Sequence, residues 1–124
     1  MRSGIDVFAD IPGGGELVRR HRWYQIRFRM WLRQGDPIRW SSAWEPSPAR
    51  VEDDGATLVT RVRIDREQLI AGLYYGYEGM KIGGKRTLRI APHLAYRERG
   101  VPGVVPENAL VTAEIEFVGE GAPP

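Results

Sequence analysis

The stretch WYQIRFRMWL, residues 23–32, decides the fold class because its side chains alternate in polarity. The apolar side chains fall on one side and the polar ones on the other: Tyr24, Ile26, Phe28, Met30 and Leu32 against Gln25, Arg27 and Arg29. A period of two is that of a β-strand with one buried face and one solvated face. The stretch therefore predicts a strand that lies over a hydrophobic core.

Working outward, the same alternation recurs at residues 56–65, 85–91 and 109–118, and more weakly at 5–11. The apolar positions of the last strong segment are Val111, Ala113, Ile115 and Phe117, and Glu114 and Glu116 lie between them. These acidic side chains would face the same solvated side as the arginines of residues 23–32. We expect the two charged faces to pair across neighbouring strands.

Residues 65–80, DREQLIAGLYYGYEGM, have a different period. Apolar side chains recur three and four residues apart, which is typical of a helix, at Leu69, Ile70, Leu73, Tyr77 and Met80. Asp65 is in a position to cap the start of this helix. Three glycines, Gly72, Gly76 and Gly79, are expected where the helix approaches the sheet or ends.

The predicted fold class is α+β: a curled antiparallel sheet of five to six strands that wraps one short helix. With 124 residues the chain is long enough for one domain, which we assign to residues 1–124 with flexible ends at 1–5 and 119–124. The chain has no cysteine, no apolar run of membrane-spanning length and no apolar core of a signal peptide. We expect a cytoplasmic protein without disulfides and without contact to a membrane.

The residues typical of acid, base, nucleophilic or metal chemistry are scarce. His21 and His93 have no second ligand at metal spacing, and we expect both in exposed or turn positions. Asp53 and Asp54 precede Gly55 in a predicted hairpin loop. The sequence contains neither a phosphate-binding loop nor a nucleophile elbow. We therefore expect no metal and no cofactor, and an apolar site suited to binding.

Between Glu16 and Arg39 the chain carries seven arginines against two acidic residues, a local charge of 7 − 2 = +5. Such a patch can attract nucleic acid or acidic partners. It is equally explained as the solvated face of a strand, since no aromatic residues alternate with the arginines on that face. Nucleic-acid binding is the less favoured of the two interpretations.

Residues 76–117, GYEGMKIGGKRTLRIAPHLAYRERGVPGVVPENALVTAEIEF, resemble the C-terminal half of the FKBP-type peptidyl-prolyl cis-trans isomerases. Shared features in the same order include the Met80–Gly83 turn, the Ala95-Tyr96 pair and the Val104-Val105-Pro106 run. The family fold agrees with the architecture predicted from the periods. The resemblance implies prolyl isomerase activity on peptides or unfolded protein clients, which needs no cofactor.

The resemblance also implies the site residues. Tyr96 would donate a hydrogen bond from its hydroxyl to a substrate carbonyl and is the one residue assigned to catalysis. The other assigned residues would line the proline cleft: Phe28, Ile38, Leu69, Ile70, Leu73, Val104, Val105 and Ala113. Ile70 would in addition offer its backbone N–H to the substrate. This role explains why the 92–109 segment places apolar residues between turn-forming ones.

Several pocket positions depart from the family pattern. Leu73 stands where the family often has Trp, Ala113 and Thr60 where it has Phe, and Arg39 or Trp40 near its Asp. The pocket should be wider and less aromatic, unless Trp40 or Trp44 refills it. Macrolide inhibitor binding and the level of activity stay open. The alternative function is a catalytically weak FKBP-fold module that binds peptides or proteins in a chaperone-like role.

Overall fold

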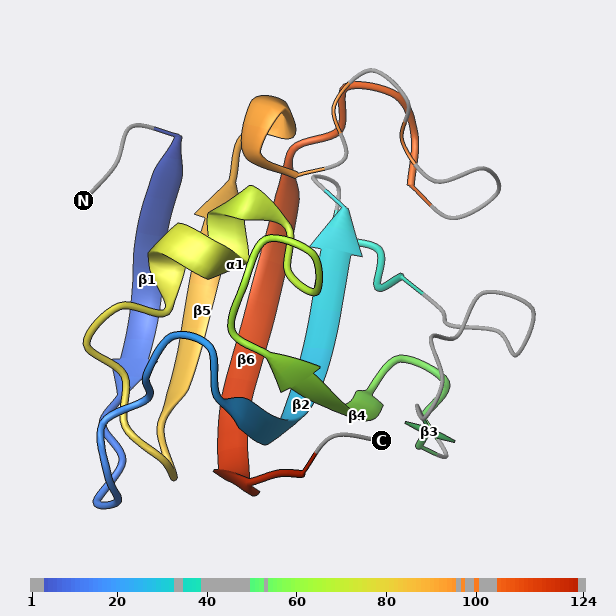
Figure 1. The fold of residues 1–124 in the computed structure, drawn as a ribbon. Coiled ribbons are helices and arrows are strands. Elements are labelled where there is room, and N and C mark those ends of the chain that lie inside the picture. The colour runs from blue at the N-terminus through green and yellow to red at the C-terminus, as the bar shows by residue number, and fades with distance from the viewer. Residues whose placement is uncertain are drawn as a thin grey trace.

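The computed structural model describes residues 4–32, 35–38, 50–52, 54–95, 97, 100 and 105–122. The strands are β1 (Ile5–Ile11), β2 (Trp23–Leu32), β3 (Arg50–Val51), β4 (Leu58–Arg63), β5 (Lys85–Ile90) and β6 (Val111–Glu120). They form one six-stranded antiparallel sheet in the order β1-β5-β6-β2-β4-β3, which does not close into a barrel (Figure 1). The short helix α1 (Ala71–Gly76) lies against one face, and a 3₁₀ helix, η1 (Pro92–Leu94), follows β5.

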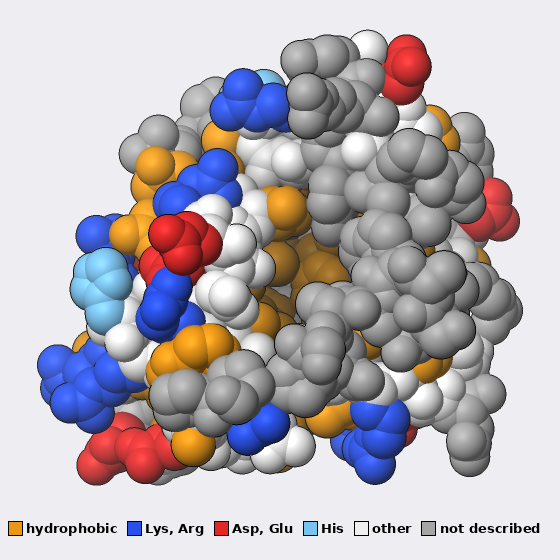
Figure 2. All heavy atoms as spheres, turned by 45° about the vertical axis from the view of Figure 1, so that its right-hand side comes forward, with side chains coloured by type: hydrophobic (Ala, Val, Ile, Leu, Met, Phe, Trp, Pro, Cys, Tyr) orange, Lys and Arg blue, Asp and Glu red, His pale blue; other side chains and the backbone are white. Residues whose placement is uncertain are grey.

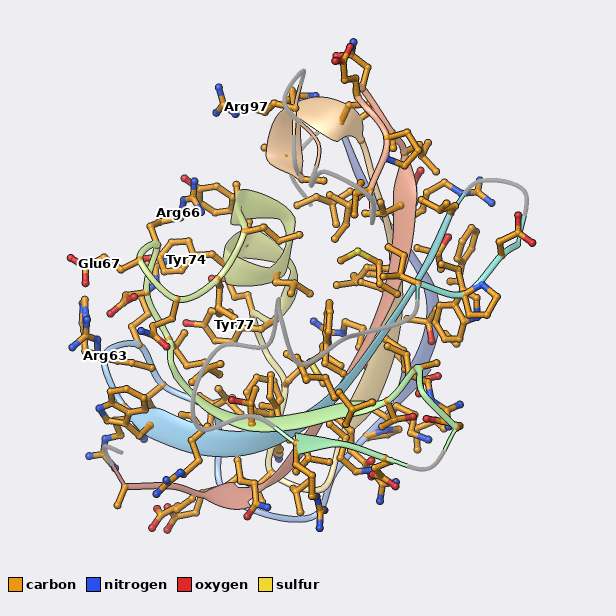
Figure 3. The ribbon with its side chains drawn as sticks, turned by 90° about the vertical axis from the view of Figure 1, so that its right-hand side faces the viewer. Arg63, Arg66, Glu67, Tyr74, Tyr77 and Arg97 are labelled. Carbon is orange, nitrogen blue, oxygen red and sulfur yellow. The ribbon has the colours of Figure 1, made fainter. Side chains whose placement is uncertain are left out.

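The alternation predicted for residues 23–32 is confirmed along the whole of β2, which lies between β6 and β4. All the strands predicted from period two are present, and the ends of β4 and β6 differ from prediction by two residues. The sheet curves, and α1 lies inside the curve (Figure 3). Burial follows from this arrangement, because one face of each central strand is covered by the helix and its flanking turns.

Charged side chains on the outer face of the sheet form ion pairs. This pairing was expected between the arginines of residues 23–32 and the acidic residues of 109–118. Arg27 forms ion pairs with Glu52 at 2.7 Å and with Glu116 at 3.8 Å. Arg29 pairs with Asp54 at 3.1 Å. Neighbouring carboxylates balance the charge of these strand arginines, which form a solvated face. Less positive charge on β2 is therefore left to attract the phosphates of a nucleic acid.

The helix is shorter than predicted, since it begins at Ala71 and not after Asp65. The Asp65 carboxylate does accept N–H bonds, from Glu67 and Gln68 at 3.0 Å each, but these close a turn that precedes the helix. Ile70, in extended conformation, is the residue before the first helical turn. A side-chain oxygen that caps a turn satisfies the same backbone donors as one that caps a helix, so the two signals look alike in sequence.

The predicted positions of the glycines are confirmed. A Cβ on Gly72 would lie 2.4 Å from Ile90 Cγ2, and one on Gly76 would lie 2.9 Å from Leu88 Cδ1, so both glycines let α1 approach β5. Gly79 follows the helix with φ +83°, a left-handed conformation that favours glycine. The helix can therefore lie directly on the β5 side chains.

The buried Arg86 on β5 fastens the end of α1 to the sheet. Its Nη1 donates to the carbonyl oxygens of Gly76 at 2.7 Å and of Glu78 at 2.8 Å. Its Nε and Nη2 donate to the two carboxylate oxygens of Asp10 on β1, at 3.1 and 3.2 Å. One guanidinium thus satisfies carbonyls that the short helix leaves unpaired and joins them to two strands.

The strands reach into the segments for which flexible ends were expected. Ile5 opens β1 with a buried side chain, and β6 continues to Glu120. Within the described residues no helix is long and apolar enough to cross a membrane.

Candidate functional site

The turn before α1 places two of the predicted cleft residues. The Leu69 N–H donates to the Asp65 carbonyl at 3.1 Å, and the Leu69 carbonyl accepts from Arg66 Nη1 at 2.6 Å. Burial acts to raise the pKa of Asp65, but hydrogen bonds from Arg63 and from the Gln68 N–H outweigh it and hold the pKa below its ordinary value. The charged Asp65 therefore stabilises the turn, with Leu69 buried and Ile70 half-buried.

The backbone of Ile70 leaves one donor available. Its carbonyl accepts the N–H groups of Leu73 at 3.1 Å and Tyr74 at 3.0 Å, as the start of a helix requires. Its own N–H donates to no acceptor within the described residues. A backbone donor beside apolar side chains is the type of group that orients a peptide carbonyl in a binding site.

The strand side of the site is formed by Phe28 and Ile38. Phe28 lies on β2 and is 7% exposed. Ile38 follows the turn after β2, and its N–H donates to the Met30 carbonyl at 2.8 Å, which folds residues 37 and 38 back along the strand. The two side chains are thereby brought to the same region of the sheet.

Val105 enters from the loop between η1 and β6. The Asn108 N–H donates to the Arg97 carbonyl at 2.8 Å, which closes the base of this loop. A Cβ on Gly100 would lie 2.2 Å from the Val105 carbonyl oxygen, so glycine allows the two sides of the loop to touch. Val105 is buried, as expected of a side chain that forms part of an apolar wall.

The described site residues all belong to or pack against the hydrophobic core of the domain, a cluster of 23 buried residues. Phe28, Ile38, Leu69, Leu73, Val105 and Ala113 belong to it, and Ile70 packs against it. Figure 2 shows a hollow in this side of the molecule with hydrophobic side chains at its bottom. Residues separated by more than eighty positions in the sequence thus contribute to one hydrophobic core.

Ala113 has no exposed surface. It is paired with Met30 on β2 and Leu88 on β5, which are both buried, so its side chain is part of the core and is not exposed to a ligand in this structure. Among the assigned residues that the structure describes, the half-buried Ile70 is the most accessible. Tyr96 and Val104 lie outside the described residues, as do Arg39, Trp40 and Trp44.

Ionisable groups suited to acid–base or metal chemistry do not gather at the site. In the described ranges no group of three His, Asp or Glu side chains could hold a metal ion. His21 and His93 are exposed, the first in a turn before β2 and the second in η1, as predicted. Asp54 lies in the β3–β4 loop, where it accepts hydrogen bonds from Ala56 and Thr57.

Sequence reasoning missed two arginines that position the site. Arg66 binds the Leu69 carbonyl, and Arg86 holds the end of α1. Arg86 occupies an inward position in the alternation of residues 85–91, with Leu88 and Ile90. A charged residue at an inward position is the signal that indicates a buried polar network.

Residues 50–118 match the family model of the FKBP-type peptidyl-prolyl cis-trans isomerases. The chain belongs to this family. The match includes α1 and the loop that carries Val105, whereas Phe28 and Ile38 lie before it.

FK506-binding protein 1A of Neurospora crassa is 50% identical over 56 residues, which are 45% of this chain and 47% of that protein. The peptidyl-prolyl cis-trans isomerase FPR2 of Saccharomyces cerevisiae is 47% identical over 51 residues, 41% of this chain and 38% of the relative. The match to these curated relatives therefore spans less than half of their length.

The whole fold is similar to that of a solved FKBP. The crystal structure of AtFKBP13 matches with a TM-score of 0.74 and 27% identity, over 96% of this chain and 94% of that one. Because 96% of the chain is covered, the similarity extends into the residues before Arg50, which the family match leaves out. The predicted fold class and family are both confirmed.

Proposed function

We propose that this protein catalyses cis-trans isomerisation of X-Pro bonds in peptides or unfolded protein clients, with the proline held in the apolar hollow. The observation that carries the proposal is that Phe28, Ile38, Leu69, Leu73 and Val105 are all buried in the core cluster against which Ile70 packs, while the Ile70 N–H donates to no acceptor within the described residues. Membership of the family supports it.

The chemistry asks for no acid, base or nucleophile, because only rotation about one amide bond is catalysed. Amide resonance sets a barrier of about 18–20 kcal/mol, and uncatalysed X-Pro exchange takes roughly tens to hundreds of seconds. The twisted amide has less charge separation than the planar one, so an apolar environment favours it. Each 1.36 kcal/mol of preferential binding to the twisted state speeds exchange about tenfold.

In the proposed mechanism the N–H of Ile70 binds a substrate carbonyl and fixes the chain at one side of the proline. The Tyr96 hydroxyl, placed by family resemblance, donates to a second carbonyl. Leu73 and Val105 contact the proline ring and exclude water from the amide. Rotation then occurs while the flanking carbonyls are held.

An exchange assay tests this proposal. NMR exchange spectroscopy on a proline peptide with an aliphatic residue before proline should show faster cis-trans exchange at micromolar protein. Val105→Thr, which keeps the side-chain volume and adds a hydroxyl, provides a matched variant. If the folded wild-type chain does not accelerate cis-trans exchange, the proposed isomerase activity is refuted.

The second candidate function is a weakly catalytic peptide-binding module with a chaperone-like role. It is favoured by Leu73 and Ala113, which stand where family members often have aromatic residues, so less ring surface is available to a proline. Peptide binding without accelerated exchange would support this function. Titration of the same peptide, followed by chemical shifts of the protein, measures it.

A further inference from the structure

Four exposed arginines, in the loop before β2 and in the turn before α1, form no ion pair within the described part of the chain. We refer to them as the basic ridge: Arg19, Arg20 and Arg22 between β1 and β2, and Arg66 on the turn before the helix. This distinguishes them from the β2 arginines on the outer face of the sheet, whose charge is balanced by carboxylates.

Backbone bonds hold the ridge together. The His21 N–H donates to the Ile64 carbonyl at 3.0 Å, and the Ile64 N–H donates to the Arg22 carbonyl at 3.1 Å. The Arg20 guanidinium lies 5.0 Å from the centre of the Tyr74 ring on α1. The loop between β1 and β2 is thereby fastened both to the segment that leads into Arg66 and to the helix.

The acidic residues nearest to Arg66 are already occupied. Arg63 forms ion pairs with Asp65 and, at 2.9 Å, with Glu67. Figure 3 shows Arg63 and Glu67 directed toward each other on the side of the molecule where Arg66 and Tyr74 also lie. Since one guanidinium holds both carboxylates, Arg66 keeps an unbalanced positive charge at this surface.

The ridge begins at the proposed substrate site. Arg66 Nη1 binds the carbonyl of Leu69, the buried neighbour of Ile70, at 2.6 Å. The Tyr74 N–H donates to the Ile70 carbonyl at 3.0 Å, so Tyr74, whose ring contacts Arg20, comes one helical turn after Ile70. A chain that leaves the hollow past this turn would meet the arginines.

We propose that the basic ridge binds acidic segments of the same polypeptide whose proline occupies the hollow, so that acidic clients are preferred substrates. This inference rests on the proposed isomerase function. A second contact on one flexible chain raises the effective concentration of proline at the site without changing the chemical step. The preference should therefore lower KM and leave kcat nearly unchanged.

An acidic peptide fits this surface better than a nucleic acid does. Single-stranded nucleic acids are held by aromatic rings that stack on bases, in addition to basic groups. The rings in this region lie beneath guanidinium groups, Tyr74 under Arg20 and Trp23 under Arg63 at 5.7 Å. Carboxylates require only the outward N–H donors of the arginines.

The test compares peptides that share one X-Pro core and differ in a tail of three Glu, three Gln or three Lys. The tail is placed before or after the proline, about six residues away, which reaches roughly 20 Å in an extended chain. At low salt we expect kcat/KM for the better-placed Glu tail to exceed that for Gln by about three- to tenfold, the range that a few exposed ion pairs supply. High salt should remove the difference.

The test variant is Arg19→Gln/Arg22→Gln, because neither side chain forms a hydrogen bond, an ion pair or a ring contact within the described residues. It should reduce the preference for Glu over Gln, since only Arg20 and Arg66 of the ridge remain, and keep the wild-type rate on the Gln peptide. Arg61→Gln, on the opposite face of the sheet, is the matched control and should keep the preference. Arg66→Gln should also reduce it, and its melting temperature shows whether the turn remains folded.

The outcomes separate the two proposals. If the Gln peptide is accelerated but both tails give equal kcat/KM, the ridge inference fails and the isomerase stands. If no peptide is accelerated, the isomerase proposal and the inference that rests on it both fail. Fluorescence anisotropy with a dT12 oligonucleotide adds a third arm: tighter binding than to the Glu peptide at equal salt, lost in the double variant, would overturn the inference in favour of nucleic acid.

Discussion

Replacement of Arg86 by methionine should destabilise the protein far more than removal of the charge of its partner Asp10. The Arg86 side chain is 9% exposed, whereas that of Asp10 is 46% exposed. Arg86 also donates to the carbonyl oxygens of Gly76 and Glu78, which end α1. The two substitutions therefore separate a buried helix-end contact from a partly solvated ion pair.

The structure sets the expected magnitudes. A hydrogen bond from a charged donor contributes about 1.5–3 kcal/mol, so the two carbonyl bonds together correspond to about 3–6 kcal/mol. Methionine regains about 1–2 kcal/mol by burying an apolar side chain. We expect Arg86→Met to lower the free energy of unfolding by about 2–4 kcal/mol. An exposed ion pair contributes about 0.2–1 kcal/mol, which is the expected cost of Asp10→Asn.

Urea unfolding of the wild type and both variants measures these costs. Arg89→Met, on the same strand but exposed and stacked 4.2 Å from the Phe8 ring, is the control and should cost less than about 1 kcal/mol. Because α1 carries Leu73, Arg86→Met should also slow prolyl isomerisation under conditions where it remains folded. Equal losses for Arg86→Met and Asp10→Asn would show that the strand ion pair, and not the helix end, carries the stability.

Three further predictions concern packing, pH and the cleft. Gly72→Ala should lower the free energy of unfolding measured in urea. Overpacking against Ile90 costs about 1–3 kcal/mol, which exceeds the helix preference of alanine over glycine, about 1 kcal/mol. An increase in the free energy of unfolding would show that the Ile90 side chain moves aside at little cost. The Thr57 hydroxyl and the N–H groups of Ala56 and Thr57 hold the pKa of Asp54 below its ordinary value, so its stabilisation is present at neutral pH and is lost as pH falls below about 4. In melts between pH 7 and 2, the stability difference between wild type and Asp54→Asn should therefore shrink on acidification, and a growing difference would contradict this. Val105→Asp should abolish isomerisation. Val105→Thr should lower the free energy of unfolding by about 1–3 kcal/mol, because Val105 is already buried in the folded chain and an unpaired buried hydroxyl carries that cost; full activity of Val105→Asp in the exchange assay would place the cleft elsewhere.

The strands were predictable because their signal is local. Every second side chain is buried from Tyr24 to Met30 in β2 and from Val111 to Phe117 in β6, and this period can be read directly in consecutive residues of each strand. Gly72 and Gly76 were interpretable for a related reason. Two glycines four residues apart share one face of a helix, and a helix face without side chains has to meet something closely.

The start of the helix and the role of Arg86 were not predictable from such patterns. Asp65 binds two N–H groups in either a turn or a helix start, and the choice depends on how residues 65–70 pack on the sheet. Arg86 sits at an inward position whose partners lie on β1 and beyond the end of α1. Its neighbours in the sequence contain no information about those groups.

By itself the sequence determined which faces are buried, how the strands and the helix follow one another, and which family the pattern resembles. Only the tertiary structure decided that Arg63 holds both Asp65 and Glu67 while the ridge arginines form no ion pair in the described chain, and that the Ile70 N–H beside the apolar cluster donates to no acceptor among the described residues. The reason is physical. Periodicity records the environment of each side chain averaged over a face, whereas ion pairs and hydrogen bonds depend on ångström-scale distances between segments that only folding brings together.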